Sequence, residues 1–267
     1  MKRIGIAGAA GKMGCALVQA VCARPELTLA AAWERPGHPA LGRDAGECAG
    51  LEALGVKIGA APALAECDVA IDFTAPAATA ALAPLAIHAK CSLVVGTTGL
   101  NAEQLKVLQR AAQQVGVIQS TNFSLGVKLL EILVEKAAAV LNANYDIEII
   151  EAHHNQKKDS PSGTALSLFQ AACRGRKLDP AQAEKYRQHE MTGVRTQAEI
   201  GLHAVRGGDI VGDHTVLFAG PGERLELKHQ AHSRNVFAHG AAGAAAWLAG
   251  KPAGWYTLGD VLGLKAL

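Results

Sequence analysis

The stretch that decides the fold is Ile4-Gly5-Ile6-Ala7-Gly8-Ala9-Ala10-Gly11-Lys12-Met13-Gly14, near the start of the chain. Its first four residues predict a short buried strand, and Cys15–Val21 directly behind the glycines predicts a helix. A strand, a glycine turn and a helix form the phosphate-binding unit of a dinucleotide fold, where the helix N-terminus faces a pyrophosphate. The spacing G-x-x-G-x-x-G alone is a weak signal, but its place after the first strand makes it specific.

The next predicted strand, Thr28–Trp33, ends at Glu34 and Arg35. In a dinucleotide fold the residue at this distance behind the glycine turn contacts the adenosine ribose. A carboxylate accepts hydrogen bonds from both ribose hydroxyls and suits NAD, whereas an arginine suits the extra phosphate of NADP. The chain carries both side by side, so we expect NADH, NADPH or both as cofactor. A pair of solvated loop residues is the alternative.

Strands and helices alternate through the first half of the chain. Further strands are predicted at 68–73, 92–95 and 117–119 and helices at 77–89 and 101–115, while 35–55 is expected to be a loop. This alternation predicts an α/β fold, a Rossmann-type parallel sheet with helices on both faces. Ligands of such sheets bind at the carboxyl ends of the strands. The turns expected to meet at this edge are 8–14, 34–35, 73–76, 96–99 and 120–123.

The pattern changes after Phe123 and predicts a second, α+β domain with a mixed open sheet. We expect a dinucleotide-binding domain of residues 1–124 and 235–267, and a substrate-binding and oligomerisation domain of residues 125–234. The second domain is predicted to contain helices at 126–143 and 164–174, strands at 145–150, 199–205, 213–219 and 224–231, and an irregular polar segment at 175–192. An Ala-rich helix at 235–249 is expected to return to the first domain.

The stretch 151–164, EAHHNQKKDSPSGT, joins a predicted strand to a predicted helix. It offers two histidines, a lysine and a helix N-cap: His153, His154, Lys157 and either Ser162 or Thr164. Backbone N–H groups at a helix start favour an anion, and an imidazole can move a proton. The alternative is a solvated turn with an ordinary cap. With a dinucleotide domain in the same chain, the stretch indicates redox chemistry on a small anionic substrate, brought to the cofactor by domain closure.

Composition excludes several other classes of protein. Lys and Arg total 26 against 24 Asp and Glu and are scattered, so we expect no nucleic-acid partner. No apolar run is long enough for a membrane span, and the first one breaks at Gly11-Lys12, too early for a signal peptide. The six cysteines form no C-x-x-C or zinc pattern and suit reduced thiols. We expect a cytoplasmic protein without a metal or a membrane partner.

The chain resembles the dihydrodipicolinate (4-hydroxy-tetrahydrodipicolinate) reductases of the diaminopimelate route to lysine, essentially from end to end. The most specific piece is the stretch 151–165, which resembles the family signature E-[AH]-H-H-x-x-K-x-D-x-P-S-G-T-A. Supporting pieces are the glycine turn, Asp72-Phe73-Thr74, Gly96-Thr97-Thr98-Gly99, Asn122-Phe123-Ser124, Arg206–Gly212 and Gly222–Glu226.

This resemblance implies NADH- or NADPH-dependent reduction of 4-hydroxy-tetrahydrodipicolinate, a cyclic imine-type dicarboxylate, to tetrahydrodipicolinate. His153 would be the acid/base histidine and Lys157 the catalytic lysine, while substrate would bind His154, Lys157, Ser162, Gly163 and Thr164. The cofactor-binding residues would be Gly8, Ala9, Ala10, Gly11, Lys12, Met13, Glu34, Arg35, Phe73, Gly96, Thr97, Thr98, Ser120, Thr121, Asn122 and Phe123. The family is also typically homotetrameric through the sheet of the second domain.

Ala75 and Cys15 depart from the pattern, because some members of the family carry arginine at these positions. Both departures remove positive charge near the expected cofactor phosphates, which favours NADH or dual use over a strict NADPH preference. Two rival functions stay open. One is a dinucleotide-binding redox sensor without turnover. The other is a metalloenzyme with His153 and His154 as ligands, although adjacent residues of a strand point to opposite faces and no third ligand stands at motif spacing.

Overall fold

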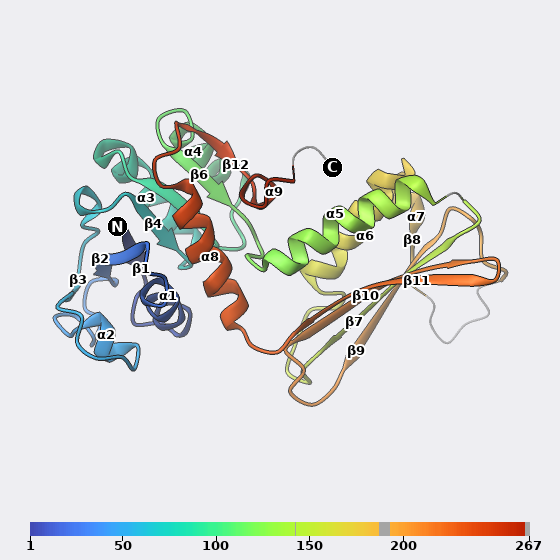
Figure 1. Cartoon of the computed structure of the whole chain (residues 1–267), viewed down its shortest axis with the longest axis horizontal. Helices are drawn as coiled ribbons and strands as arrows, with labels where there is room; N and C mark the ends of the chain where they lie inside the picture. The colour runs from blue at the N-terminus through green and yellow to red at the C-terminus, as the bar shows by residue number, and fades with distance from the viewer. Residues whose placement is uncertain (142, 187–192, 265–267) are drawn as a thin grey trace. The chain divides into compact units, whose positions relative to one another are not determined.

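The computed structural model describes residues 1–141, 143–186 and 193–264. The chain divides into two compact units (Figure 1). Unit 1 contains Met1–Ser124 and the segment that begins at Asn235, and unit 2 contains Leu125–Arg234. No helix of the described residues is both long enough and apolar enough to span a membrane.

Unit 1 contains the predicted Rossmann-type sheet. Its seven strands lie in the order β12-β6-β5-β4-β1-β2-β3, and every pair is parallel. Their bounds are β1 Lys2–Ala7, β2 Leu27–Trp33, β3 Ile58–Gly59, β4 Val69–Asp72, β5 Ser92–Val95, β6 Gly116–Gln119 and β12 Gly254–Tyr256. The edge strands β3 and β12 were not predicted, because two or three residues are too few to show a periodicity.

Helices cover both faces of this sheet, as a parallel sheet requires. Helices α1 and α8 pack together, and α3 packs with α4 (Figure 1). The bounds are α1 Lys12–Cys22, α2 Ala45–Cys48, the 3₁₀ helix η1 Leu64–Glu66, α3 Pro76–Ala89, α4 Ala102–Ala111, α8 Asn235–Leu248 and α9 Leu258–Val261. Two details differ from the prediction. The expected loop 35–55 contains α2, capped by Asp44, and α4 ends before the turn that leads into Gly116.

Gly240 lets α8 approach the backbone of Phe123 closely. A Cβ atom at Gly240 would lie 1.7 Å from the Phe123 carbonyl oxygen, whereas one at Gly243 of the same helix would meet only Arg24 Nη1, at 3.6 Å. We therefore expect Gly240→Ala to destabilise unit 1 by about 1–3 kcal/mol, as overpacking does. Gly243→Ala should be neutral or stabilise the helix by up to about 1 kcal/mol.

Thermal unfolding of the two purified variants measures this difference. A melting temperature of Gly240→Ala equal to that of Gly243→Ala would contradict the close contact.

Unit 2 is an α+β unit with a mixed five-stranded sheet in the order β11-β10-β7-β9-β8. Strand β10 is antiparallel to β11 and β7, whereas β9 is parallel to β7 and β8. Helices α5 and α6 lie on one face of the sheet (Figure 1). The bounds are α5 Leu125–Val140, β7 Asp146–His153, α6 Gly163–Arg176, α7 Pro180–Ala183, β8 Glu184–Lys185, β9 Ile200–Arg206, β10 Gly212–Gly220 and β11 Glu223–Ala231.

Three predictions about unit 2 need correction or restriction. Strand β7 continues to His153, three residues past its expected end at Ile150, and its alternation of inward and outward side chains continues with it. The segment predicted as irregular contains α7 and β8, and its residues 187–192 lie outside the described residues. Residue 142 of the predicted helix 126–143 and residues 265–267 also lie outside them.

Candidate active site

The carboxyl ends of five parallel strands meet at one edge of the unit 1 sheet. Their last residues pair in one row across the sheet: Trp33, Ala7, Asp72, Val95 and Gln119. Each predicted cofactor turn begins directly behind one of these residues. The structure therefore brings the turns of β1, β2, β4, β5 and β6 to a single edge, where dinucleotides bind in folds of this kind.

The glycine turn has the geometry of a phosphate cradle. Gly8 has φ +65°, and the amides of Gly8 and Ala9 donate to the Trp33 carbonyl at 2.9 and 3.2 Å. A Cβ atom at Gly14 would lie 2.0 Å from the Gly8 carbonyl oxygen, so only glycine permits the turn. Gly11 is the N-cap of α1 and offers no side chain to the first-turn amides, which leaves these donors for an anion.

Glu34 lies beside this turn at the end of β2. Its Oε1 accepts from the amide of Ala10 at 3.2 Å and its Oε2 from the amide of Arg35 at 3.2 Å. A half-buried carboxylate next to the cradle suits ribose hydroxyls, and the exposed Arg35 suits an added phosphate. The side chains of Lys12 and Met13 also reach the surface of the turn. The residues of this edge therefore fit a nicotinamide dinucleotide.

The other predicted cofactor residues separate into exposed and buried groups. The Phe73 and Phe123 ring centroids are 5.3 Å apart, and a Cβ at Gly96 would lie 2.2 Å from the Phe73 ring. The Thr97 hydroxyl is buried, accepts from the Thr74 amide at 3.0 Å and lies 2.9 Å from Thr79 Oγ1. Phe123 and Thr97 therefore offer a ligand mainly their backbone. Thr98 and Thr121 are exposed, and the Ser120 hydroxyl donates to the Asn122 carbonyl at 2.7 Å.

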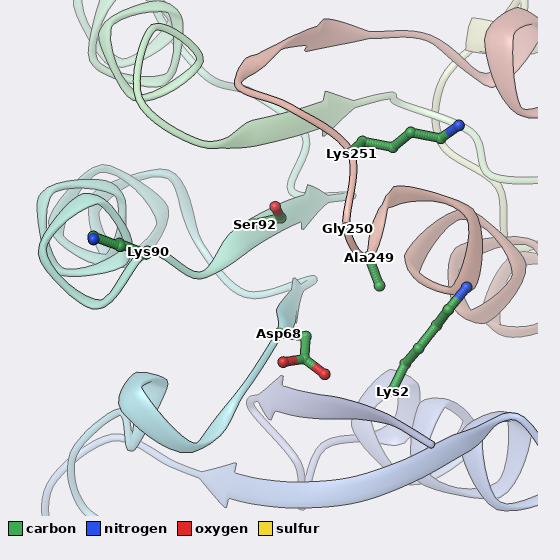
Figure 2. A pocket seen from close by; sticks show the side chains of 7 residues that line it. All are labelled: Lys2, Asp68, Lys90, Ser92, Ala249, Gly250 and Lys251. Carbon is green, nitrogen blue, oxygen red and sulfur yellow. The ribbon is translucent and has the colours of Figure 1, made fainter.

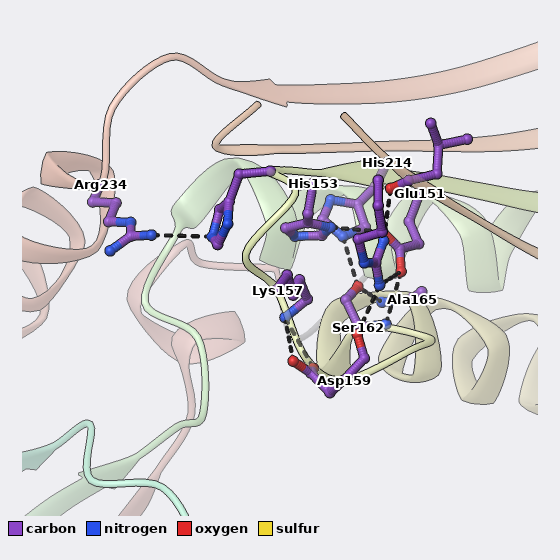
Figure 3. Close-up of polar contacts among 11 residues, drawn as sticks. Glu151, His153, Lys157, Asp159, Ser162, Ala165, His214 and Arg234 are labelled. Carbon is purple, nitrogen blue, oxygen red and sulfur yellow. Dashed lines mark hydrogen bonds and ion pairs between the residues drawn. The ribbon is translucent and has the colours of Figure 1, made fainter. Parts of the chain in front are cut away.

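The predicted proton donor in unit 2 lies at the end of a row of inward side chains on β7. Ile147 and Ile149 pack in the core, and Glu151 and His153 continue the row. Glu151 is only 1% exposed, and its Oε2 lies 2.6 Å from Nδ1 of His153 (Figure 3). The strand thus delivers a carboxylate–imidazole pair from the core to the loop that follows.

Besides His153, two residues hold the carboxylate of Glu151 through three N–H groups. Arg206, at the end of β9, donates from Nη1 and Nη2 to its two oxygens at 2.8 Å each. The amide of Ser162 donates to Oε1 at 3.1 Å. Burial alone would raise the pKa of Glu151, but the hydrogen bonds from Arg206 and His153 outweigh it and hold this pKa below its usual value. The carboxylate is therefore ionised.

Ser162 connects this pair to the N-terminus of α6. It is the N-cap, with its hydroxyl accepting from the Ala165 amide at 3.1 Å, which decides between the two predicted caps. Its hydroxyl also lies 3.0 Å from Nε2 of the buried His214, whose ring stands edge-on to that of His153 at 5.1 Å. Burial and, to a lesser extent, the neighbouring His153 lower the pKa of His214 to about 4. His214 is therefore neutral at pH 7.

Charged side chains from the loop and from Arg234, which follows β11, lie on the exposed side of the site. Lys157 Nζ pairs with Asp159 at 2.9 Å and shows no direct contact with His153 (Figure 3). Arg234 Nη2 donates to Nε2 of His154 at 3.2 Å. Open space lies where a side chain at Gly163 would begin, and Thr164 follows it in the first turn of α6. This arrangement offers an anion two cations and a helix start.

No role was predicted for four residues of the site: Glu151, Arg206, His214 and Arg234. Glu151 stands two residues before His153, so a strand continued to His153 would have placed both on one face. His214 pairs with Glu151 across β10, and Arg206 pairs with His153 across β9. The local sequence pattern does not determine which residues of two strands pair. Arg206 and His214 could therefore not have been predicted as neighbours of this site from the sequence.

One other possible site carries no comparable chemistry. A pocket at the amino-terminal edge of the unit 1 sheet has three lysines, but their side chains run in different directions (Figure 2). The ammonium group of Lys2 donates to the Ala246 carbonyl rather than to the pocket. Among the described residues no group of three His, Cys, Asp or Glu side chains could hold a metal ion, and all six cysteines are free.

Two family models match almost the whole chain. "Dihydrodipicolinate reductase, N-terminus" matches residues 2–123, and "Dihydrodipicolinate reductase, C-terminus" matches residues 126–262. The chain belongs to the dihydrodipicolinate reductase family.

Individual members of this family align over their full length. A 4-hydroxy-tetrahydrodipicolinate reductase of Ruegeria pomeroyi is 51% identical over 97% of both chains. One of Methylocella silvestris is 50% identical over 98% of this chain and 97% of its own. A dipicolinate-bound dihydrodipicolinate reductase from Paenisporosarcina sp. TG-14 superposes with a TM-score of 0.77 at 28% identity, covering 96% of this chain and 97% of that one.

Proposed function

We propose that the protein reduces 4-hydroxy-tetrahydrodipicolinate to tetrahydrodipicolinate with NADH or NADPH, in the diaminopimelate route to lysine. The observation that carries this proposal is the loop 151–164. It holds an imidazole on a buried carboxylate beside a helix N-terminus, in a chain 51% identical to a reductase of that name. Residues 1–124 with 235–267 would bind the cofactor, and residues 125–234 the substrate.

The dicarboxylate substrate would be held by cations and by the start of α6. One carboxylate would lie at the start of α6, on the backbone of Gly163 and Thr164 beside the N-cap Ser162. The other would draw on His154, Lys157 and Arg234, and Lys157 would exchange its partner Asp159 for the substrate. Open space at Gly163 supports this approach, because no side chain blocks the helix start.

Reduction needs one hydride and one proton. When bound, the nicotinamide supplies the hydride. Water leaves the hydroxylated ring, either on the protein or beforehand, and the conjugated double bond that remains accepts the hydride. His153 or Lys157 then delivers a proton to the adjacent carbon. Positive charge on the loop stabilises the enamine-like charge that develops.

Glu34 is expected to set the preference for NADH. Glu34→Gln should lower kcat/KM for NADH about 10–100-fold, because it removes a charged acceptor of the two ribose hydroxyls. The value for NADPH should change less, since Arg35 can meet the added phosphate. Cys15 and Ala75, at positions where some members of the family carry arginine, favour NADH or dual use in the unaltered protein.

Steady-state kinetics with each cofactor measure this change. Glu52→Gln removes an exposed carboxylate elsewhere in unit 1 and serves as control. Equal losses for NADH and NADPH would mean that Glu34 only supports the turn.

A coupled assay tests the proposed function as a whole. The preceding synthase generates the substrate from pyruvate and aspartate semialdehyde, and cofactor oxidation is followed with NADH and NADPH in parallel. Oxidation of either establishes the reaction. Dinucleotide binding without oxidation would favour a redox sensor of the same fold, and activity lost on chelation would favour a metalloenzyme.

A homotetramer and a cytoplasmic location belong to the same proposal. The sheet face of unit 2 opposite α5 and α6 carries Ile150 and Val205, which are 39% and 48% exposed. These partly exposed apolar residues support assembly through this face. Light scattering on the purified protein measures the number of subunits.

A further inference from the structure

We propose that Glu151, clamped by Arg206, is the positioning residue of His153: it holds the proton of the neutral ring on Nδ1 and makes Nε2 the nitrogen that exchanges protons with substrate. The inference rests on the proposed function only for the identity of the substrate. The hydrogen bonds around Glu151 do not depend on which substrate is bound.

The groups around the Glu151 carboxylate are all donors. Arg206 presents two N–H groups and Ser162 its amide, at 2.8, 2.8 and 3.1 Å. A guanidinium and a backbone amide can only donate, and an ionised carboxylate can only accept. The 2.6 Å contact with Nδ1 of His153 is therefore a hydrogen bond only if Nδ1 carries a proton. This condition assigns the tautomer of the neutral ring.

The opposite nitrogen of His153, Nε2, lies beside Gly212, where a larger residue would crowd it. A Cβ atom at Gly212, the first residue of β10, would lie 3.0 Å from Nε2 of His153. Neutral His214 covers the ring edge-on at 5.1 Å, so it adds no positive charge beside a ring that must itself become protonated. His153 is 8% exposed, and Nε2 is the nitrogen left for a ligand because Nδ1 is occupied.

The same carboxylate also connects the proton donor to the helix start. Oε2 of Glu151 holds His153, while Oε1 holds the amide of the N-cap Ser162 at 3.1 Å. One carboxylate therefore holds both the proton donor and the N-cap residue that begins α6. Arg206 completes the frame, since Nη2 also donates to the Asp159 carbonyl at 2.7 Å.

The proton step follows from this assignment. The imidazolium gives the proton on Nε2 to the substrate carbon, the N–H bond breaks as the C–H bond forms, and the other proton stays on Nδ1, hydrogen-bonded to the Glu151 carboxylate. The neutral ring that remains is the tautomer that the carboxylate stabilises. Solvent then returns a proton to Nε2, so no further reactant is needed.

Glu151→Gln tests the role of the carboxylate with little change of shape. An amide presents one donor group and one acceptor, so at least one of the donors around it meets another donor. We expect kcat to fall about 10–100-fold, as when the carboxylate partner of a functional histidine is lost. KM for the substrate and dipicolinate affinity should change much less, because the helix start and the cations remain.

Glu148→Gln is a matched control from the same strand. Glu148 also joins a histidine and an arginine, with His203 Nε2 at 2.7 Å and Arg195 Nε at 2.9 Å, but it lies on the outward side of β7. Glu148→Gln loses the same charge from the same type of cluster. Because this cluster lies on the other side of β7 from His153, the variant should keep kcat. Equal losses of kcat in the two variants would mean that Glu151 acts only through stability.

The tautomer is measured directly in the unaltered protein. Nitrogen-15 NMR of histidine-labelled protein, with the signal of His153 assigned from its absence in His153→Gln, should show a proton on Nδ1 and none on Nε2 when the ring is neutral. The opposite pattern would overturn the proposal, whatever the fold or activity of any variant. Failure of the coupled assay with this pattern intact would refute only the proposed reaction.

Discussion

The His153→Gln variant is expected to fold and bind NADH normally but to lose about 10²–10⁴ of kcat, the usual contribution of a general acid or base. Glutamine can still accept or donate a hydrogen bond near Glu151, so the buried carboxylate keeps a polar neighbour. It cannot exchange a proton with substrate. The loss should therefore appear in kcat rather than in KM, and steady-state kinetics in the coupled assay measure it.

His239→Gln is the matched control, because His239 is an exposed residue of α8 in unit 1. It should match the unaltered protein in kcat and KM. Lys157→Ala should raise KM as well as lower kcat, since Lys157 would both bind a carboxylate and offer a proton. If His153→Gln retained full kcat while Lys157→Ala lost it, the proton donor would be Lys157, and the carboxylate–imidazole pair would be structural.

The parts of the site that sequence predicted are those formed by residues close together along the chain. The turn from Gly8 to Gly14 requires glycines at fixed spacing, because a Cβ at Gly14 would collide with the Gly8 carbonyl. The loop behind β7 likewise contains His153, Lys157 and Ser162 within a few residues. Local spacing determines such features, so a single stretch of sequence is enough to predict them.

The parts that sequence missed depend on strand register. Arg206 and His214 meet Glu151 from β9 and β10, more than fifty residues along the chain, through pairing that only the folded sheet determines. Burial also limits how some residues could act. Thr97 and Phe123 are predicted ligand contacts, and because their side chains lie in the interior, such a contact would use mainly the backbone. A motif identifies a residue type but not the direction of its side chain.

Acidification from pH 7 to pH 4 is expected to destabilise unit 2 by about 3 kcal/mol through His214 alone. The pKa of His214 is about 4 in the fold, against 6.5 for an exposed histidine, because the ring is buried and faces His153 and His229. Between these two values the unfolded chain binds a proton that the folded chain does not. Stability therefore falls as the pH falls from 6.5 to about 4.

Protonation of Glu151 also lowers the stability of unit 2 as the pH falls. Its pKa is also lowered in the fold, so its contribution is present above the pKa of the unfolded chain and is lost as the pH falls through the folded value. The negative charges of Glu151 and Asp213 oppose part of this effect by raising the pKa of the His214 ring. The unfolding midpoint in urea at a series of pH values should show the combined loss.

The His214→Gln variant separates the two contributions. Its amide can keep the hydrogen bond to Ser162 Oγ but cannot titrate, so the fall in stability between pH 6.5 and 4.5 should largely disappear. The fall at lower pH, which comes from Glu151, should remain. His239→Gln should keep the full pH dependence of the unaltered protein, because His239 is exposed. A His214→Gln variant that is as acid-sensitive as His239→Gln would show that the fold does not lower the pKa of His214, and this ring could not be the source of the acid sensitivity.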